Sequence, residues 1–128
     1  MIEQHEPSEK FGFSQYVTVR AGTDLVFISG QSAYDPELNG YGDTFAAQVE
    51  RCFDNLLATV RRAGASAATV AKVTTLVVDL DEERHDVLNA VMKRHFPAGY
   101  FPASALIPVA RLSTPGMLIE IDAVVVLS

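Results

Sequence analysis

Short apolar segments alternate with polar connections along the first part of the chain. Residues 1–15 are mostly polar and show no helical period, so they predict an extended lead-in. Residues 16–20 and 25–29 each predict a β-strand. The four residues between these strands include Gly22, and this spacing predicts a hairpin-like connection.

A helical period follows a predicted loop at residues 30–42. Asp43 is suited to cap the helix, because its side chain can accept a hydrogen bond from a free backbone N–H. Gly64 marks the end, since glycine readily adopts the conformation that terminates helices. The apolar residues on one face of this helix recur every three or four positions: Val49, Phe53, Leu56 and Val60.

The second half of the chain repeats the alternation of strand and helix. Residues 70–78, rich in valine and threonine, predict a strand. Acidic residues open a second helix at Asp81, where the helix dipole favours them, and Pro97 ends it. Residues 103–112 and 118–127 predict two final strands. The order β-β-α-β-α-β-β is that of an α+β sheet with two helices.

The predicted strands are apolar on both faces, although two helices most simply cover only one face of a sheet. Leu25 and Phe27 point to one side of their strand, while Val26 and Ile28 point to the other. Self-association through the second face is the economical prediction, and closed rings or dimers are the usual forms. The less favoured alternative is an apolar face left exposed.

Composition and charge narrow the class of protein. The 128 residues, 48% of them hydrophobic, predict one domain over residues 1–128. The net charge of −6 argues against a nucleic-acid binder with a basic groove. The first ten residues have no apolar run, no stretch approaches the ~20 residues of a membrane span, and Cys52 has no disulfide partner. We expect a soluble cytoplasmic protein.

Two carboxylates lie on one side of the last predicted strand. Glu120 and Asp122 are separated by about 6–7 Å along the strand and have apolar neighbours. A carboxylate desolvated at a subunit interface would be suited to proton transfer. The alternative is that both side chains are solvated or paired with Lys or Arg on a neighbouring strand.

Other polar residues give weaker signals. Gly30 ends a predicted strand, where it either exposes backbone N–H groups to a ligand or only turns the chain. His5, His85 and His95 show no metal-ligand spacing, so we expect surface or half-buried side chains. Cys52 is expected in the core.

Several segments together resemble the Rid (reactive intermediate deaminase) family, also called RidA/YjgF or endoribonuclease L-PSP, over nearly the whole chain. They are LVFISGQ (25–31), Gln48 with NL (55–56) and AGA (63–65), VAKVT (70–74), FPA (101–103), VARL (109–112) and IEI (119–121).

The resemblance implies a chorismate-mutase-like fold, with helices on one face of the sheet and a homotrimer formed through the other. It implies that a small-molecule ligand binds in clefts between subunits. It also implies the hydrolysis of reactive enamines and imines, such as 2-aminoacrylate, to a ketone and ammonia without a metal or cofactor. Older labels of the family mention translation inhibition and endoribonuclease activity.

The cleft residues of the family match this sequence only in part. The resemblance implies that Tyr16, Gly30 and Asn89 line the cleft and that Glu120 holds or activates the attacking water. The position after Phe-Pro-Ala is an arginine that clamps the substrate carboxylate in the deaminases, and it is Ser104 here. A serine hydroxyl supplies one neutral hydrogen bond instead of two charge-assisted ones.

Arg111 is the nearest candidate to replace that arginine. It lies seven positions after Ser104, so an unbroken strand points the two side chains to opposite faces. A bulge at Pro108 would reset the alternation. Arg111 also belongs to a family motif, which favours a structural role.

Two functions therefore remain. The first is a Rid-like deaminase for an imine or enamine without a carboxylate, with Glu120 as the base and backbone groups near Gly30 orienting the substrate. The second is a trimer of the same fold that has lost the reaction and binds a small metabolite or a protein partner. Ser104 is compatible with both. The acidic charge disfavours a ribonuclease.

Overall fold

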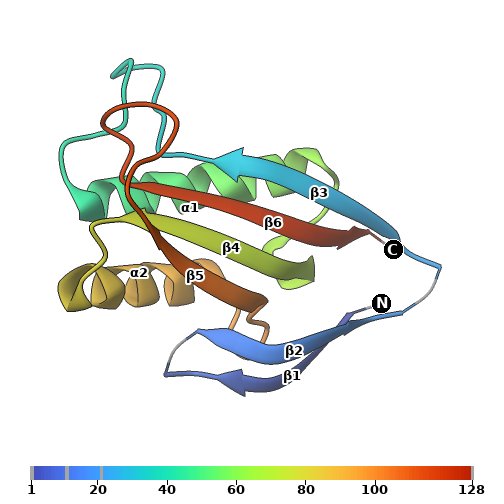
Figure 1. Cartoon of the computed structure of the whole chain (residues 1–128). Helices are drawn as coiled ribbons and strands as arrows, with labels where there is room; N and C mark the ends of the chain where they lie inside the picture. The colour runs from blue at the N-terminus through green and yellow to red at the C-terminus, as the bar shows by residue number, and fades with distance from the viewer. Residues whose placement is uncertain (1, 11, 21, 128) are drawn as a thin grey trace.

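The computed structural model, which describes residues 2–10, 12–20 and 22–127, has a four-stranded sheet with two helices on one face (Figure 1). A two-stranded sheet lies beside one edge of the larger one. This is the predicted α+β fold class. The elements are β1 (Ile2–Ser8), β2 (Phe13–Val19), β3 (Asp24–Gln31), α1 (Phe45–Arg62), the short 3-10 helix η1 (Ala67–Thr69), β4 (Val70–Val78), α2 (Glu82–His95), β5 (Ala103–Val109) and β6 (Ile119–Leu127).

The strand order in the larger sheet is β3-β6-β4-β5, so the last strand in sequence occupies an inner position. β6 pairs antiparallel with β3 and β4, and β4 pairs parallel with β5. The parallel pair requires a crossover, which α2 provides. Alternate residues of β6 are buried under the helices: Ile119, Ile121, Ala123 and Val125.

The structure corrects the prediction for the N-terminal strands. β2 does not pair with β3 but with β1, in the region predicted to be an extended lead-in, and His5 stands opposite Tyr16. β3 pairs instead with β6, where Phe27 stands opposite Val124. The physical reason is apolar contact. β6 is largely apolar, whereas β2 is half polar, so β3 makes more apolar contacts beside β6 than it would beside β2. Closeness in sequence alone therefore gave the wrong partner.

Both helices begin and end close to the predicted positions. Thr44, not Asp43, caps α1, and its hydroxyl accepts a hydrogen bond from the Ala47 N–H at 3.1 Å. Asp81, where α2 was predicted to begin, caps this helix by accepting a hydrogen bond from the Arg84 N–H at 2.8 Å. None of the helices in the described ranges is long and apolar enough to cross a membrane. The predicted apolar stripe of α1 is fully buried: Val49, Phe53, Leu56 and Val60.

The sheet face away from the helices, which we call the open face, carries large apolar side chains. Leu25 and Phe27 on β3 are 49% and 74% exposed, whereas Ile28 is 7% exposed. Leu76 and Val124 on the neighbouring strands are partly exposed on the same side. The predicted two-sided apolar character of β3 is therefore confirmed. Figure 1 shows both helices behind the sheet and no element in front of it among the drawn residues.

Candidate functional site

Gly30 and Glu120 lie against each other at the end of β3. The pairing of β3 with β6 shifts register between Ile28 and Gln31, and Gly30 lies within this irregularity. A Cβ atom at Gly30 would stand 2.6 Å from Cδ and 2.8 Å from Oε2 of Glu120. A side chain at position 30 would therefore displace the flexible end of the Glu120 side chain. Glycine allows the carboxylate to approach the backbone this closely.

The two carboxylates of β6 have different surroundings. Glu120 is half-buried and pairs with Leu76 across the sheet, whereas Asp122 is exposed. Within the described part of the chain, neither side chain forms an ion pair with Lys or Arg. Pairing with Lys or Arg on a neighbouring strand is therefore absent among the described residues, whereas the other alternative, a solvated side chain, holds for the exposed Asp122. Glu120 is a half-buried carboxylate without such a partner.

Cys52 lies behind this group, in the core beneath β3. Its thiol donates a hydrogen bond to the Gln31 carbonyl at 3.2 Å. Burial raises the pKa of the thiol to about 12, the negative charge of Glu120 adds to the rise, and a backbone hydrogen bond from Ile121 opposes it. The thiol therefore stays protonated. This confirms the expectation of a core cysteine and excludes a thiolate nucleophile.

Asn89 and Ser104 form a second group on the helix-covered side of the sheet. They line a cavity of about 130 Å³ between α2, β5 and β2. Ser104 stands opposite the fully buried Val73 of β4. Residues opposite each other in a ladder share a face, so Ser104 points toward the helices. The other lining residues are Phe13, Thr75, His85, Leu88, Met92 and Leu106.

A single chain does not bring the two groups together. Glu120 alternates with the fully buried Ile119 and Ile121, so its side chain leaves the sheet on the open face. Ser104 and Asn89 lie on the opposite face. Tyr16 belongs to neither group: it is 53% exposed on β2, and its ring stacks on His5 with centroids 4.3 Å apart.

The structure places Arg111 away from the position that would replace the missing arginine. β5 pairs with β4 in unbroken register from Ala103 to Val109, so Pro108 introduces no bulge. Arg111 follows the strand, in a loop. Its guanidinium donates to the carbonyls of Leu112 at 3.0 Å and Ser113 at 3.2 Å. These contacts support the structural role.

His85 is exposed, as expected for a surface or half-buried histidine, and it also lines the Asn89 cavity, which was not predicted. His85 and Asn89 are four positions apart on α2, which places them on one face of the helix. That spacing could have indicated a shared cavity. Phe13, a second lining residue that was not predicted, comes from the segment expected to be an extended lead-in.

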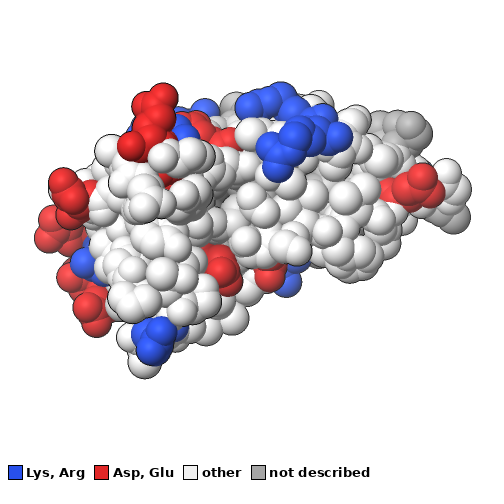
Figure 2. All heavy atoms as spheres, turned by 90° about the horizontal axis from the view of Figure 1, so that it is seen from above, with Lys and Arg blue, Asp and Glu red and all other residues white. Residues whose placement is uncertain are grey.

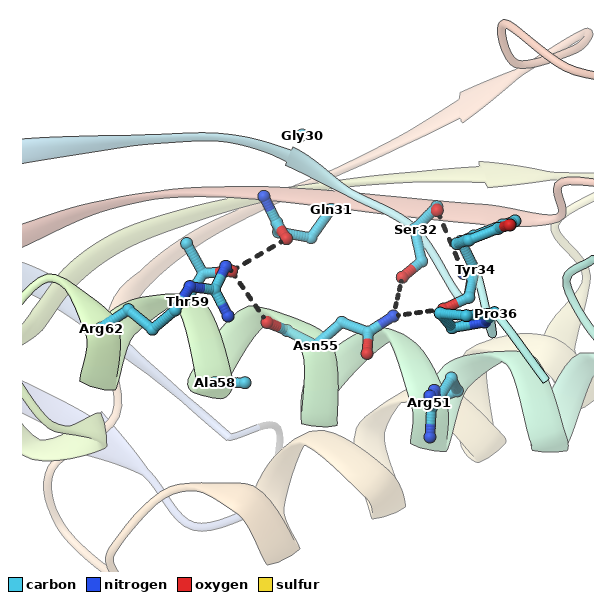
Figure 3. A pocket seen from close by; sticks show the side chains of 10 residues that line it. All are labelled: Gly30, Gln31, Ser32, Tyr34, Pro36, Arg51, Asn55, Ala58, Thr59 and Arg62. Atoms are coloured by element: carbon cyan, nitrogen blue, oxygen red, sulfur yellow. Dashed lines mark hydrogen bonds between the residues drawn. The ribbon is translucent and has the colours of Figure 1, made fainter. Parts of the chain in front are cut away.

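A second, wider groove of about 410 Å³ lies between α1 and the segment after β3, with Gly30 at its rim (Figure 3). Its polar groups bind each other. The Asn55 amide donates to the carbonyls of Ser32 at 2.8 Å and Tyr34 at 3.0 Å. The Thr59 hydroxyl donates to the Gln31 side chain at 3.1 Å. Asn55 therefore fixes the position of the segment that follows Gly30.

Charged residues do not form a basic stripe on the face seen in Figure 2. Lys and Arg side chains form one larger group there, and the others lie at scattered positions among acidic side chains. The net charge of the chain is −6. This distribution lacks the basic track that nucleic-acid binding requires.

Comparison with known proteins agrees with this fold over almost the whole chain. The family model described as endoribonuclease L-PSP matches residues 3–127. A RutC family protein of Sinorhizobium fredii is 36% identical over 106 residues, which cover 82% of this chain and 81% of the relative. Protein DfrA of Myxococcus xanthus is 36% identical over 116 residues, with 89% and 84% covered.

Solved structures show the same similarity. The structure of a conserved Rid family protein of unknown function from Yersinia pestis matches with a TM-score of 0.87 and 31% identity, covering 98% of this chain and 94% of that one. RidA from the Antarctic bacterium Psychrobacter sp. matches with a TM-score of 0.73 and 32% identity, covering 98% and 100%. The chain belongs to the Rid/YjgF family, whose family model is described as endoribonuclease L-PSP.

Proposed function

We propose that this protein is a Rid-type deaminase that hydrolyses an imine or enamine to a carbonyl compound and ammonia. The observation that carries the proposal is the Glu120 carboxylate, half-buried and packed against the Gly30 backbone without an ion-pair partner among the described residues. A carboxylate so placed can accept a proton from a bound water, while nearby backbone N–H groups orient a substrate.

The reaction needs only water and proton transfers. An enamine first takes up a proton at carbon and loses one from nitrogen, which makes it the imine. Glu120 accepts a proton from water as the water oxygen bonds to the imine carbon, and the imine nitrogen takes up a proton as its π bond to carbon breaks, which gives the carbinolamine. The carbinolamine nitrogen then takes the proton held by Glu120, the C–N bond breaks with its electron pair on nitrogen, and the hydroxyl proton returns to solvent as the carbonyl forms and ammonia leaves. Imine plus water thus gives carbonyl plus ammonia, with no metal or cofactor in the scheme.

We propose that a homotrimer completes the site. Glu120 and Gly30 face the open side of the sheet, while Asn89 and Ser104 line the cavity under α2. Packing of the open face against a neighbouring copy would bury Phe27 and bring Glu120 of one subunit toward the Asn89 group of the next. The small-molecule ligand would then bind in the cleft between subunits, with Tyr16 at its edge.

The cavity lining supports a substrate without a carboxylate. Its described walls are mostly apolar, and their polar contributors are Thr75, His85, Asn89 and Ser104. None of these supplies a permanent cation or the bidentate geometry of a guanidinium. Leaving a carboxylate without such a partner in a partly dry cleft is costly. A neutral imine or enamine fits this lining better than an imino acid does.

The alternative is a trimer of the same fold that binds a small metabolite or a protein partner without turnover. Ser104 is the observation that favours it, because the usual anchor of the substrate is absent. The family description also names endoribonuclease activity. The net charge of −6 disfavours that function for this chain.

The test is the variant Glu120→Gln, assayed on imines generated in place by amine and amino-acid oxidases, with semicarbazide as the competing trap. If Glu120 is the base, turnover should fall by roughly 100-fold or more, because general-base catalysis contributes at least that factor. The matched control is Asp122→Asn, on the same strand but exposed, which should keep its activity.

Three outcomes decide between the functions. Unchanged turnover in Glu120→Gln would contradict the catalytic role. Loss of the oligomer in this variant would show that the Glu120 carboxylate has a structural role. Failure of the wild type to hydrolyse any neutral or acidic imine would favour the binding protein.

A further inference from the structure

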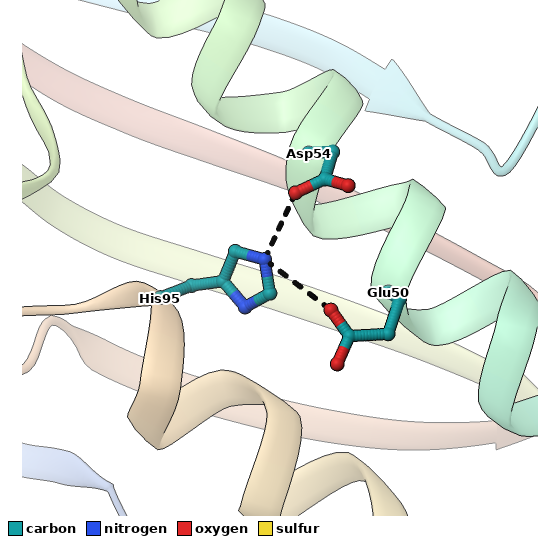
Figure 4. A group of neighbouring side chains, drawn as sticks. All are labelled: Glu50, Asp54 and His95. Carbon is teal, nitrogen blue, oxygen red and sulfur yellow. Dashed lines mark hydrogen bonds and ion pairs between the residues drawn. The ribbon is translucent and has the colours of Figure 1, made fainter.

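Three metal-ligating side chains meet on the outer layer of the molecule, where the end of α2 packs against α1 (Figure 4). Glu50 and Asp54 are one turn apart on α1, and His95 is the last residue of α2. Nε2 of His95 lies 3.1 Å from Oδ1 of Asp54 and 3.7 Å from Oε2 of Glu50. One ligand atom from each residue lies within 4.8 Å of the others.

The hydrogen bond made by Nδ1 of His95 determines which ring nitrogen can bind a metal ion. Nδ1 lies 2.8 Å from the carbonyl oxygen of Val91, which can only accept a hydrogen bond. Nδ1 therefore carries a proton. Without a proton, Nε2 then presents a lone pair to two carboxylate oxygens, so three acceptors face one another. Either a proton on Nε2, which forms the two ion pairs, or a metal ion between the three atoms removes this repulsion.

The surroundings hold the histidine in this orientation. The His95 side chain is 13% exposed, and its ring stacks on Phe53 with centroids 5.3 Å apart. A hydrogen bond from the second ring nitrogen to a backbone carbonyl is the usual support of a metal-binding histidine. Arg94 forms an ion pair with the Oε1 atom of Glu50 and leaves Oε2 turned toward the ring.

We propose that Glu50, Asp54 and His95 form a binding site for one divalent transition-metal ion of the zinc class. Ligands bound to a common zinc ion at 2.0–2.1 Å with tetrahedral angles lie about 3.3 Å from one another. The distances of 3.1 and 3.7 Å from Nε2 bracket this value. Asp54 is 62% exposed, so water can reach the remaining coordination position.

The donor set selects the class of metal. An imidazole nitrogen with two carboxylate oxygens suits zinc and its neighbours, whereas magnesium and calcium prefer oxygen ligands alone. Because the ligands come from two helices, a bound ion ties the end of α2 to the middle of α1. Its expected effect is on stability. The site shares no residue with the proposed cleft, so it does not depend on the deaminase proposal.

The test is titration of chelator-treated protein with Co²⁺, followed by its visible absorption, and with Zn²⁺, followed by calorimetry and thermal unfolding. We expect one ion per chain and a higher unfolding temperature with zinc, since a ligand that binds only the folded state stabilises it. A large excess of Mg²⁺ or Ca²⁺ should not displace the ion.

Two variants and one control make the site identifiable. His95→Gln and Asp54→Asn should each weaken zinc binding by at least tenfold and abolish the thermal shift. Asp54 is exposed, so its variant tests the site even if His95→Gln fails to fold. His5→Gln, on β1 and outside the cluster, should bind like the wild type. Equal zinc affinity in wild type and Asp54→Asn, or no saturable binding to the wild type, would overturn the proposal.

Discussion

At the scale of single residues, the departure from the family pattern at Ser104 has the clearest chemical consequence. The Ser104 side chain lines the Asn89 cavity, at the position where the resemblance to the deaminases implies an arginine. A hydrogen bond to a charged group contributes about 1.5–3 kcal/mol, which corresponds to roughly a tenfold or larger change in an equilibrium constant. An imino acid should therefore be a poor substrate.

We predict that the wild type hydrolyses 2-iminopropionate slowly and that Ser104→Arg raises the rate about tenfold or more by supplying a bidentate carboxylate partner. The measurement is competition with semicarbazide for the imine released by an amino-acid oxidase. Ser104→Ala, which adds no cation, should remain as slow as the wild type. Rapid turnover of 2-iminopropionate by the wild type would mean that another cation has taken over the clamp.

The site residues differ in how far the sequence alone could identify them. Gly30 and Glu120 were named first from the strand pattern and then from the resemblance, and the structure adds their close contact. His85 was not predicted to line the cavity, because the cavity also needs walls from β5 and β2. The partnership of His95 with Glu50 joins two helices, which spacing along one helix cannot reveal.

At the scale of elements, the end of β3 is the segment on which the proposed chemistry depends. Its register shift against β6 brings Gly30 beneath the Glu120 carboxylate, and Asn55 of α1 holds the residues that follow. The backbone of Gly30 is not in a left-handed conformation, so only the contact with Glu120 favours glycine there. A substitution there tests the packing without adding backbone strain.

We predict that Gly30→Ala displaces the Glu120 carboxylate and destabilises the fold by no more than about 1 kcal/mol, because the end of a flexible side chain can move away from the new methyl group. Urea unfolding measures this loss. In a double-mutant cycle, Glu120→Ala should recover most of it by removing the atoms that the new methyl group meets. Gly40→Ala is the matched control, because the nearest atom to its added Cβ would be 3.7 Å away. A crystal structure of Gly30→Ala with the Glu120 side chain in its original position would contradict the close contact.

The hydrophobic periodicity predicted where the helices and strands lie better than it predicted which strands pair. Both helices and the strands after residue 24 lie close to the expected positions, because the apolar spacing of each segment reflects its own burial. The pairing of β2 with β1 was not predictable in this way. Ile2–Ser8 is polar and contains a proline, and its strand conformation depends on the hairpin it forms with β2. The Ser14 N–H in turn binds the Pro102 carbonyl at 2.9 Å, next to β5.

At the scale of the whole molecule, two features support the proposed homotrimer: the apolar open face, and the separation of Glu120 from Asn89 on opposite faces of the sheet. Phe27 and Leu25 project from a face that no described element covers, and burying a large apolar side chain contributes about 1.5–3 kcal/mol. The face also carries Glu120, whose proposed partners lie on the far side of the sheet. The proposed trimer accounts for both features.

The most direct test of the central claim, an intersubunit site in a homotrimer, is sedimentation equilibrium at micromolar protein. We predict a mass of about 42 kDa for the wild type, three times the 13.9 kDa of one chain. Phe27→Asp should dissociate the trimer, because it places a charge in the interface. Leu38→Asp, at a 64% exposed loop position outside the open face, should leave the trimer intact. A wild type that sediments as a stable monomer would contradict the intersubunit site, because Glu120 and Asn89 would then remain on opposite faces of the sheet.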